Sequence, residues 1–239
     1  MKSTSSRTRD IGARRDSSEL FASVFESDNS SEVFRVLDVG CGAGDSMREE
    51  LELCRRAIGD ETRIEMVGVD IDEESLAQGR LNFPQFEFVR GRGEQLPFSD
   101  ERFDVVISRV AVCYMDIPIV LREMRRVLKV GGEVKMKLHP YTFTLAELRA
   151  EIGSGPLWRR AQSAVYRGYV FANGLALHLG GFNFRFPLAR RRCESFQTRE
   201  GMRRALVAAH FGKVDFSCWD TRIEWPHAGN CRVSAYRVR

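Results

Sequence analysis

Short apolar runs alternate with amphipathic stretches through the first 140 residues. Five runs rich in Val, Ile, Leu and Phe are predicted to be buried strands: Val33–Val39, Ile64–Val69, Phe86–Val89, Phe103–Ser108 and Glu133–Leu138. Apolar positions at helical spacing between them predict three helices: Ser46–Ile58, Asp72–Leu81 and Ile117–Leu128, the last closed by Gly131-Gly132. Alternation of this kind is typical of a parallel sheet with helices on both faces.

The alternation breaks after residue 139 and resumes near the end of the chain. A further helix is predicted over Thr198–His210, and two strands over Val214–Trp219 and Arg232–Val238. The predicted fold class is α/β: a doubly wound, mostly parallel seven-stranded Rossmann-like sheet with a terminal antiparallel hairpin and a helical cap inserted after the fifth strand. The predicted organisation is a flexible N-terminal tail with a short helix (1–31), a ligand-binding core (32–139), a cap (140–197) and a segment completing the core (198–239).

Composition is that of a globular protein without a membrane span. Hydrophobic residues make up 43% and charged residues 29% of the 239 residues, and a net charge of +4 does not by itself indicate nucleic acid binding. No apolar run approaches the roughly 20 residues that a membrane span needs. The six cysteines form no Cys-x-x-Cys pair, which predicts a reducing, cytoplasmic setting. The Arg/Ser-rich N-terminus is interpreted as a disordered tail, with an organelle transit peptide as the alternative.

A glycine-rich turn follows the first strand. Gly40, Gly42 and Gly44 alternate, and Asp38 lies two residues before the first of them. Glycine lets the backbone turn sharply and approach a ligand, and the start of the next helix offers free N–H groups. The dinucleotide fingerprint is G-x-G-x-x-G, whereas the spacing here is G-x-G-x-G with a preceding acid. A pyrophosphate does not favour a carboxylate at that place, so the spacing argues against a nicotinamide-dependent dehydrogenase.

The second predicted strand also ends in an acidic residue. Asp70 can accept hydrogen bonds from both hydroxyls of a ribose, and Ile71 can pack on a base. Dehydrogenases place an acid here too, so this feature indicates that a nucleoside is bound but does not distinguish between cofactors that contain one. The alternative role of an acid at this point, capping the next helix, fits Asp72 better than Asp70.

Four sequence blocks in this order resemble the class I S-adenosylmethionine-dependent methyltransferase family, in its ubiquinone/menaquinone-biosynthesis-like branch. The blocks span residues 33 to about 139: Val36–Gly44, Gly68–Ile71, Gly91–Phe98 with Phe103–Ser108, and Arg126–Gly132. The resemblance implies that S-adenosyl-L-methionine is the cofactor. Asp38, Gly40, Cys41 and Gly42 would hold its methionine end, with Asp38 beside the ammonium group. Asp70 would hold the ribose, and Ile71 would pack on the adenine.

The third block departs from the family pattern. The family commonly has Gly-Asp-Ala-Glu before Leu-Pro-Phe, and this chain has Gly91-Arg92-Gly93-Glu94-Gln95 there. Arg92 has no acceptor for the adenine amino group. The Gly93 amide can still donate, and Glu94 or Gln95 can supply the missing acceptor. The substitution is also the one feature that favours a scaffold protein that has kept the fold without turnover.

The segment that follows the fourth strand is expected to line the reaction centre, and Ser108 and Arg109 at its start are candidate cofactor-binding residues. It lacks the Asn/Asp-Pro-Pro-aromatic tetrapeptide of enzymes that methylate amino groups of nucleic acid bases, and Cys113 is interpreted as a buried thiol. Tyr114 is a candidate to contact the sulfonium or the substrate, with a core aromatic as the alternative. His139, at the end of the fifth strand, is the best general-base candidate, with a structural histidine as the alternative. No carboxylate cluster accompanies these strand ends, so no metal is predicted.

The predicted cap is rich in aromatic and arginine residues. An apolar pocket for a small lipid-like or aromatic acceptor is one interpretation, and a cap with its own core is the other. The arginines between 185 and 204 suit an anionic group or anionic headgroups, giving peripheral membrane contact, or else form a solvated surface. Methyl transfer to a small molecule is the main hypothesis. An inactive scaffold and an RNA or protein methyltransferase are the alternatives, with nucleic acid disfavoured and the oligomeric state left open.

Overall fold

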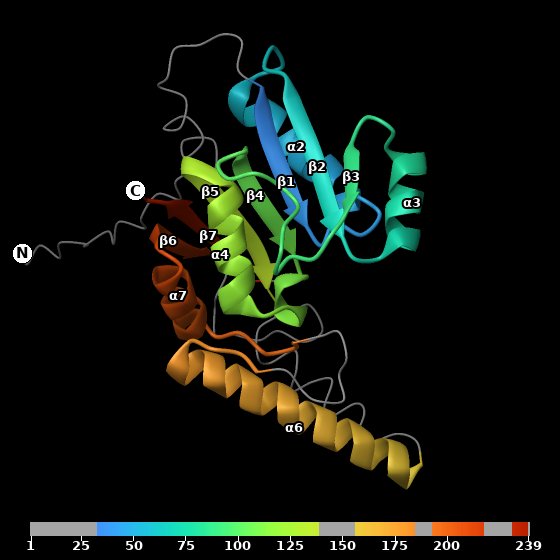
Figure 1. Cartoon of the computed structure of the whole chain (residues 1–239), viewed down its shortest axis with the longest axis vertical. Helices are drawn as coiled ribbons and strands as arrows, with labels where there is room; N and C mark the ends of the chain where they lie inside the picture. Colours follow the sequence, from blue (N-terminus) through green and yellow to red (C-terminus); the bar gives the residue numbers. More distant parts are fainter. Residues whose placement is uncertain (1–32, 139–155, 185–192, 218–230, 239) are drawn as a thin grey trace, which may run out of the picture.

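A seven-stranded sheet forms the centre of the molecule (Figure 1), in a computed structural model that describes residues 33–138, 156–184, 193–217 and 231–238. Its order is β3-β2-β1-β4-β5-β7-β6. Neighbouring strands from β3 through β5 run parallel, whereas β7 pairs antiparallel with both β5 and β6. The strands are β1 (Phe34–Val39), β2 (Ile64–Asp70), β3 (Glu87–Arg90), β4 (Phe103–Arg109), β5 (Leu128–Leu138), β6 (Phe211–Ser217) and β7 (Cys231–Arg237). The sheet confirms the predicted fold class.

Helices cover both faces of this sheet, and each face has its own apolar core. On one face α2 (Asp45–Ile58) and α3 (Glu73–Asn82) bury side chains such as Met47 and Leu76 against β1, β2 and β4. On the other face α4 (Ile117–Val127) and α7 (Arg199–Ala208) bury side chains such as Met124 and Met202. The central strands are therefore apolar on both sides, which explains their continuous Val, Ile and Leu runs.

A long helix, α6 (Leu157–Gly180), lies beyond the edge at which β1 and β2 end (Figure 1). Leu177 joins the core beneath α4 and α7, and Thr198 caps the start of α7 by accepting a hydrogen bond from the Gly201 amide at 3.0 Å. Threonine is a favoured residue at this position because its side-chain oxygen accepts from a free N–H of the first turn. Among the described residues, no helix combines the length and the hydrophobicity needed to cross a bilayer.

The predicted end of α4 was wrong. The helix ends at Val127, and Leu128 already pairs with Phe103 as the first residue of β5. Gly131, with φ of 82°, lies in an irregularity of β5 where the register with β4 shifts, so these glycines bend a strand rather than cap a helix. The next predicted strand, Val214–Trp219, was also placed too late, because β6 begins at the buried Phe211.

Candidate functional site

The loops after β1, β2, β3 and β4 meet at one edge of the sheet, because the carboxyl ends of parallel strands lie together. The turn after β1 makes the closest approach. Gly40, Gly42 and Gly44 all have positive φ, at 77°, 54° and 89°. A Cβ on Gly40 would lie 2.2 Å from the Cβ of Ala111, so only glycine lets the segment after β4 pack on this turn. A Cβ on Gly42 would meet nothing within 4 Å, so this turn faces open space.

Asp38 lies fully buried directly behind the glycine turn. The Ser46 hydroxyl donates to its Oδ2 at 2.7 Å, whereas its Oδ1 has no hydrogen-bond partner. Burial raises the pKa of Asp38 from 3.8 to about 7, and the Ser46 hydrogen bond and the nearby Arg109 oppose that rise. A buried carboxylate with one unsatisfied oxygen suits a cationic hydrogen-bond donor.

Asp70 joins the loop after β2 to the glycine turn. Its Oδ2 accepts a hydrogen bond from the Gly42 amide at 2.9 Å, and its Oδ1 accepts one from the Asp72 amide at 3.0 Å. Each carboxylate oxygen has a second lone pair for a further donor. Ile71, the next residue, is 47% exposed, so its apolar side chain is accessible beside Asp70. Asp72 is the residue before α3, as the sequence indicated.

The loop after β3 carries the departure from the family pattern. Arg92 pairs with Glu94 at 3.5 Å, and its side chain is 43% exposed. Glu94 is mostly buried, and its Oε1 also accepts from the Asp116 amide at 3.4 Å. A Cβ on Gly93 would lie 2.5 Å from the Met115 sulfur, so the backbone of this loop packs tightly on the segment after β4.

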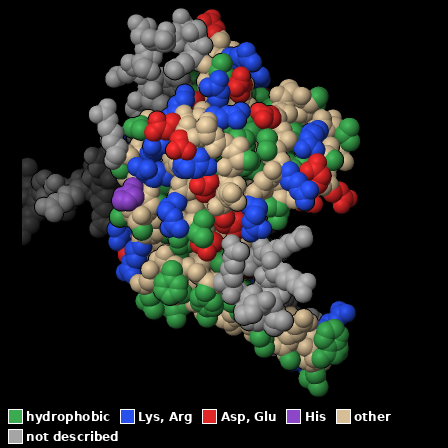
Figure 2. All heavy atoms as spheres, in the orientation of Figure 1, with side chains coloured by type: hydrophobic (Ala, Val, Ile, Leu, Met, Phe, Trp, Pro, Cys, Tyr) green, Lys and Arg blue, Asp and Glu red, His purple; other side chains and the backbone are tan. Residues whose placement is uncertain are grey.

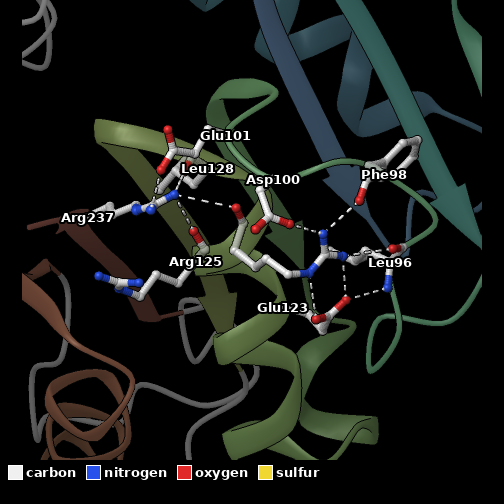
Figure 3. A network of polar contacts seen from close by, with 9 residues as sticks. Leu96, Phe98, Asp100, Glu101, Glu123, Arg125, Leu128 and Arg237 are labelled. Atoms are coloured by element: carbon white, nitrogen blue, oxygen red, sulfur yellow. Dashed lines mark hydrogen bonds and ion pairs between the residues drawn. The ribbon is translucent and has the colours of Figure 1, made fainter. Parts of the chain in front are cut away.

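One arginine of α4 fixes the end of this loop (Figure 3). The Arg126 guanidinium donates to the carbonyl oxygens of Leu96 (3.0 Å) and Phe98 (2.8 Å), and it pairs with Asp100 and Glu123 at 2.8 Å each. Glu123 in turn accepts from the Leu96 amide at 2.8 Å, and its hydrogen bond with Arg126 lowers its pKa. Arg126 belongs to one of the four sequence blocks, but its contacts with the loop after β3 were not predicted. We call this set of contacts the Arg126 clamp.

The segment after β4 brings the remaining candidates to the edge. The Ser108 hydroxyl is buried and donates to the Val39 carbonyl oxygen at 2.8 Å, which ties β4 to β1. Arg109 forms an ion pair with Glu49 of α2. Cys113 and Tyr114 lie in the short helix η1 (Val112–Tyr114), where Cys113 is the buried thiol that was expected.

A segment that sequence analysis missed packs against η1. The Cys193 amide donates to the Tyr114 carbonyl oxygen at 3.0 Å, and the Ser195 amide donates to the Cys113 carbonyl oxygen at 3.1 Å. Ser195 and Gln197 are buried, and the Ser195 Oγ and Gln197 Oε1 atoms have no hydrogen-bond partner. Backbone pairing between segments 80 residues apart leaves no local pattern, so no sequence signal predicted it.

Polar side chains on the buried side of α6 bind the segment 193–197 that packs against η1. Asn173 is fully buried, and its amide nitrogen donates to the Glu194 carbonyl oxygen at 2.9 Å. The Glu194 carboxylate accepts from the Tyr166 hydroxyl and pairs with the buried Arg167 at 3.6 Å. The described part of the segment predicted to be a cap therefore has buried polar contacts as well as apolar ones.

His139, the general-base candidate, lies outside the described residues. Within the described ranges, no group of three or more His, Cys, Asp or Glu side chains has the arrangement of a metal site. The other candidate residues, from Asp38 to Tyr114, lie in the strand ends and loops at this edge of the sheet.

The residues that form this edge resemble known methyltransferases. The family described as "Methyltransferase domain" matches residues 37–136. Phthiotriol/phenolphthiotriol dimycocerosates methyltransferase 1 of Mycobacterium ulcerans is 33% identical over 134 residues, which are 55% of this chain and 47% of that protein. Demethylmenaquinone methyltransferase of Chlorobaculum tepidum is 32% identical over 99 residues, which are 41% of this chain and 38% of that protein. The chain thus spans less than half the length of these two relatives.

The fold is also shared with solved structures. An S-adenosylmethionine-dependent methyltransferase from Mesorhizobium loti superposes with a TM-score of 0.53 at 17% identity, covering 92% of this chain and 96% of that one. This likeness concerns the fold alone.

Proposed function

We propose that this chain is a class I S-adenosylmethionine-dependent methyltransferase that transfers the methyl group to a small apolar or aromatic acceptor, and the match of residues 37–136 to the methyltransferase domain family supports this. The unsatisfied Oδ1 of the buried Asp38 is the observation that carries the proposal. A cationic donor is what that oxygen lacks, and the cofactor has an ammonium group at its methionine end. The turn at Gly42 has open space for a ligand, since a Cβ built there would meet no atom of the surrounding protein within 4 Å.

The nucleoside half of the cofactor fits the neighbouring loops. Asp70 has lone pairs to spare for the ribose hydroxyls, and Ile71 offers an exposed apolar surface for the adenine. The Gly93 amide and Glu94 are proposed to read the adenine edge, because Arg92 cannot accept a hydrogen bond from its amino group. Arg92 instead pairs with Glu94, so the substitution adds a charge partner to this loop.

The bound cofactor supplies an activated methyl group on a sulfonium. The chain must align an acceptor with it and exclude water, which matters more than a dedicated catalytic group. Tyr114 in η1 and the segment around Ser195 are proposed to border the acceptor, because their backbones are hydrogen bonded at this edge. His139, which follows Leu138 of β5 directly, is proposed to take a proton from an acceptor that must lose one.

The acceptor class is proposed on two grounds. The names of the two relatives describe methyl transfer to dimycocerosates and to a demethylmenaquinone. The buried, unpartnered Ser195 Oγ and Gln197 Oε1 suit one polar group on an otherwise apolar molecule. An O, N or C atom as the methylated position fits these features equally well, and no metal ion is required for the proposed transfer.

Transfer of a labelled methyl group tests this function. The protein is incubated with methyl-labelled S-adenosylmethionine and, separately, a prenylated hydroquinone, a hydroxylated lipid, total RNA and a protein extract. We expect label in the solvent-extractable product of the first or second reaction, lost in Asp38→Asn. Label in RNA or protein would replace the small-molecule proposal, and cofactor binding without transfer to any acceptor would favour the scaffold alternative.

A further inference from the structure

The solvent-facing side of α6 is apolar. Leu157 is 79% exposed, Val165 is 62% exposed, Leu175 is 50% exposed and Leu179 is 65% exposed. Figure 2 shows hydrophobic side chains along the lower edge of the molecule and at the free end of this helix. Single exposed apolar residues need no explanation, whereas a continuous exposed row on one helix indicates an interaction surface.

Helical spacing places these residues on one face of α6. At about 100° per residue, one side of the helix carries only apolar or small residues: Leu157, Ala161, Ala164, Val165, Gly168, Phe171, Ala172, Leu175 and Leu179. The opposite side packs on the protein through buried residues that include Tyr169, Val170 and Leu177. A helix at a protein surface normally shows polar residues outward, so the solvent side of α6 requires a partner.

The sequence from the start of α6 to just beyond the end of α7 is strongly basic. Residues 157–210 contain ten arginines, no lysine and two glutamates, although the whole chain has a net charge of only +4. Both glutamates already have cationic partners: Glu194 pairs with Arg167, and Glu200 pairs with Arg203 and Arg204. Anionic partners are therefore favoured.

An aromatic residue and two arginines lie at the N-terminal end of α6. Trp158 is 63% exposed, and the Arg159 guanidinium lies 5.1 Å from its ring centroid. Arg160 is also exposed. Tryptophan with arginine beside an apolar helix face is the composition of helices that lie in the interface of a lipid bilayer.

We propose that α6 (Leu157–Gly180) docks this protein on an anionic lipid surface, with its apolar face in the acyl boundary and the exposed arginines at its two ends on the headgroups: Arg159 and Arg160 in the first turn, and Arg204 beside the last turn. Because α6 lies beyond the strand ends of the site (Figure 1), docking brings the candidate site toward the bilayer. An apolar acceptor held in the bilayer would then be concentrated near the site. That consequence rests on the proposed function, whereas the docking itself does not.

Two other occupants fit the surface less well. A second copy docked through the same face would bring Arg159 and Arg160 of both copies to the interface, although Glu194 and Glu200 already have cationic partners within the chain. RNA would use the arginines but would leave the row of Leu, Val and Ala unburied.

Co-sedimentation with vesicles tests the proposal. The full chain is mixed with vesicles of phosphatidylcholine alone or of phosphatidylcholine with phosphatidylglycerol. We expect binding to the mixed vesicles that weakens by at least about tenfold in Leu175→Glu/Leu179→Glu, because charged residues replace buried apolar ones. The matched control is Leu53→Glu/Leu81→Glu, which adds the same charge at exposed leucines of α2 and α3 and is expected to bind like wild type, apart from a small general charge effect.

Each remaining outcome overturns the proposal. Equal binding by both double variants, equal binding to neutral and anionic vesicles, or no binding at all would remove the docking surface. Retarded migration of polyuridylate RNA without vesicle binding would assign the arginines to nucleic acid, and a dimer by sedimentation equilibrium that Leu175→Glu/Leu179→Glu dissociates would assign the face to a second copy. Calorimetric binding of S-adenosylhomocysteine is measured on the same samples, so a failure of docking is distinguished from a failure of the cofactor site.

Discussion

Replacing Asp38 with asparagine is expected to stabilise the protein and to weaken cofactor binding, which are effects in opposite directions. The folded-state pKa of Asp38 is about 7 against an ordinary value of 3.8. Between these two pH values the folded chain holds a proton that the unfolded chain has released, so stability falls as pH rises. A shift of about 3 units corresponds to about 4 kcal/mol of destabilisation above pH 7.

Asp38→Asn removes this charge while keeping an oxygen for the Ser46 hydroxyl. Its amide nitrogen takes the place of the unsatisfied Oδ1 and also lacks a partner. Leaving this nitrogen unsatisfied costs about 1–2 kcal/mol, which reduces the stabilisation. The net expectation at pH 8 is therefore about 2 kcal/mol of added stability without cofactor. The loss of one partner of a buried charge pair is expected to weaken S-adenosylhomocysteine binding by about 2 kcal/mol or more, or about thirtyfold.

Urea unfolding and calorimetric titration at pH 6, 7 and 8 measure both effects. In the wild type, about one tenth of Asp38 is ionised at pH 6, so affinity is expected to fall about tenfold from pH 8 to pH 6. In Asp38→Asn the affinity is expected to be weak and independent of pH over this range. A variant that is less stable at pH 8 and binds the ligand as well as wild type would refute the assignment of Asp38 as the acceptor for the ammonium group.

Three further substitutions follow from the structure. Gly42→Ala, at φ of 54° with open space around the new Cβ, should lower the free energy of unfolding by about 1–2 kcal/mol. Gly131→Ala, at φ of 82°, should have the same cost. Only Gly42→Ala should weaken S-adenosylhomocysteine binding in calorimetry. In Arg126→Lys the ammonium group cannot donate to the Leu96 and Phe98 carbonyl oxygens at the same time, as the guanidinium does. Hydrogen exchange of the Leu96 amide should therefore accelerate, and ligand affinity should fall several-fold. An unchanged exchange rate would contradict the Arg126 clamp. Thr198→Ala should lower the free energy of unfolding by about 1 kcal/mol in urea titrations, with Thr198→Ser near wild type.

Local patterns in the sequence predicted the elements that depend on local physics. The strand and helix order came from hydrophobic periodicity, and the site edge came from glycines and acids at strand ends. The error at Gly131 arose because a glycine at positive φ serves both a helix end and an irregular strand, and only the pairing of Leu128 with Phe103 distinguishes them.

Contacts between distant segments were beyond this reasoning. The Arg126 clamp joins α4 to a loop about 30 residues earlier, and the Cys193–Gln197 segment pairs with η1 about 80 residues earlier. The apolar side of α6 was present in the sequence as aromatic and aliphatic residues. Which side of the helix they occupy became clear only once the buried side was known.

The central claim is that this sheet edge binds S-adenosylmethionine, and calorimetric titration with S-adenosylhomocysteine and with NAD tests it most directly. We predict micromolar binding of the first and none of the second by the wild-type protein. Asp70→Asn should weaken that binding, and Asp60→Asn, at an exposed acid in the turn between α2 and β2, should leave it unchanged. Absence of S-adenosylhomocysteine binding by folded protein, or tighter binding of NAD, would contradict the account.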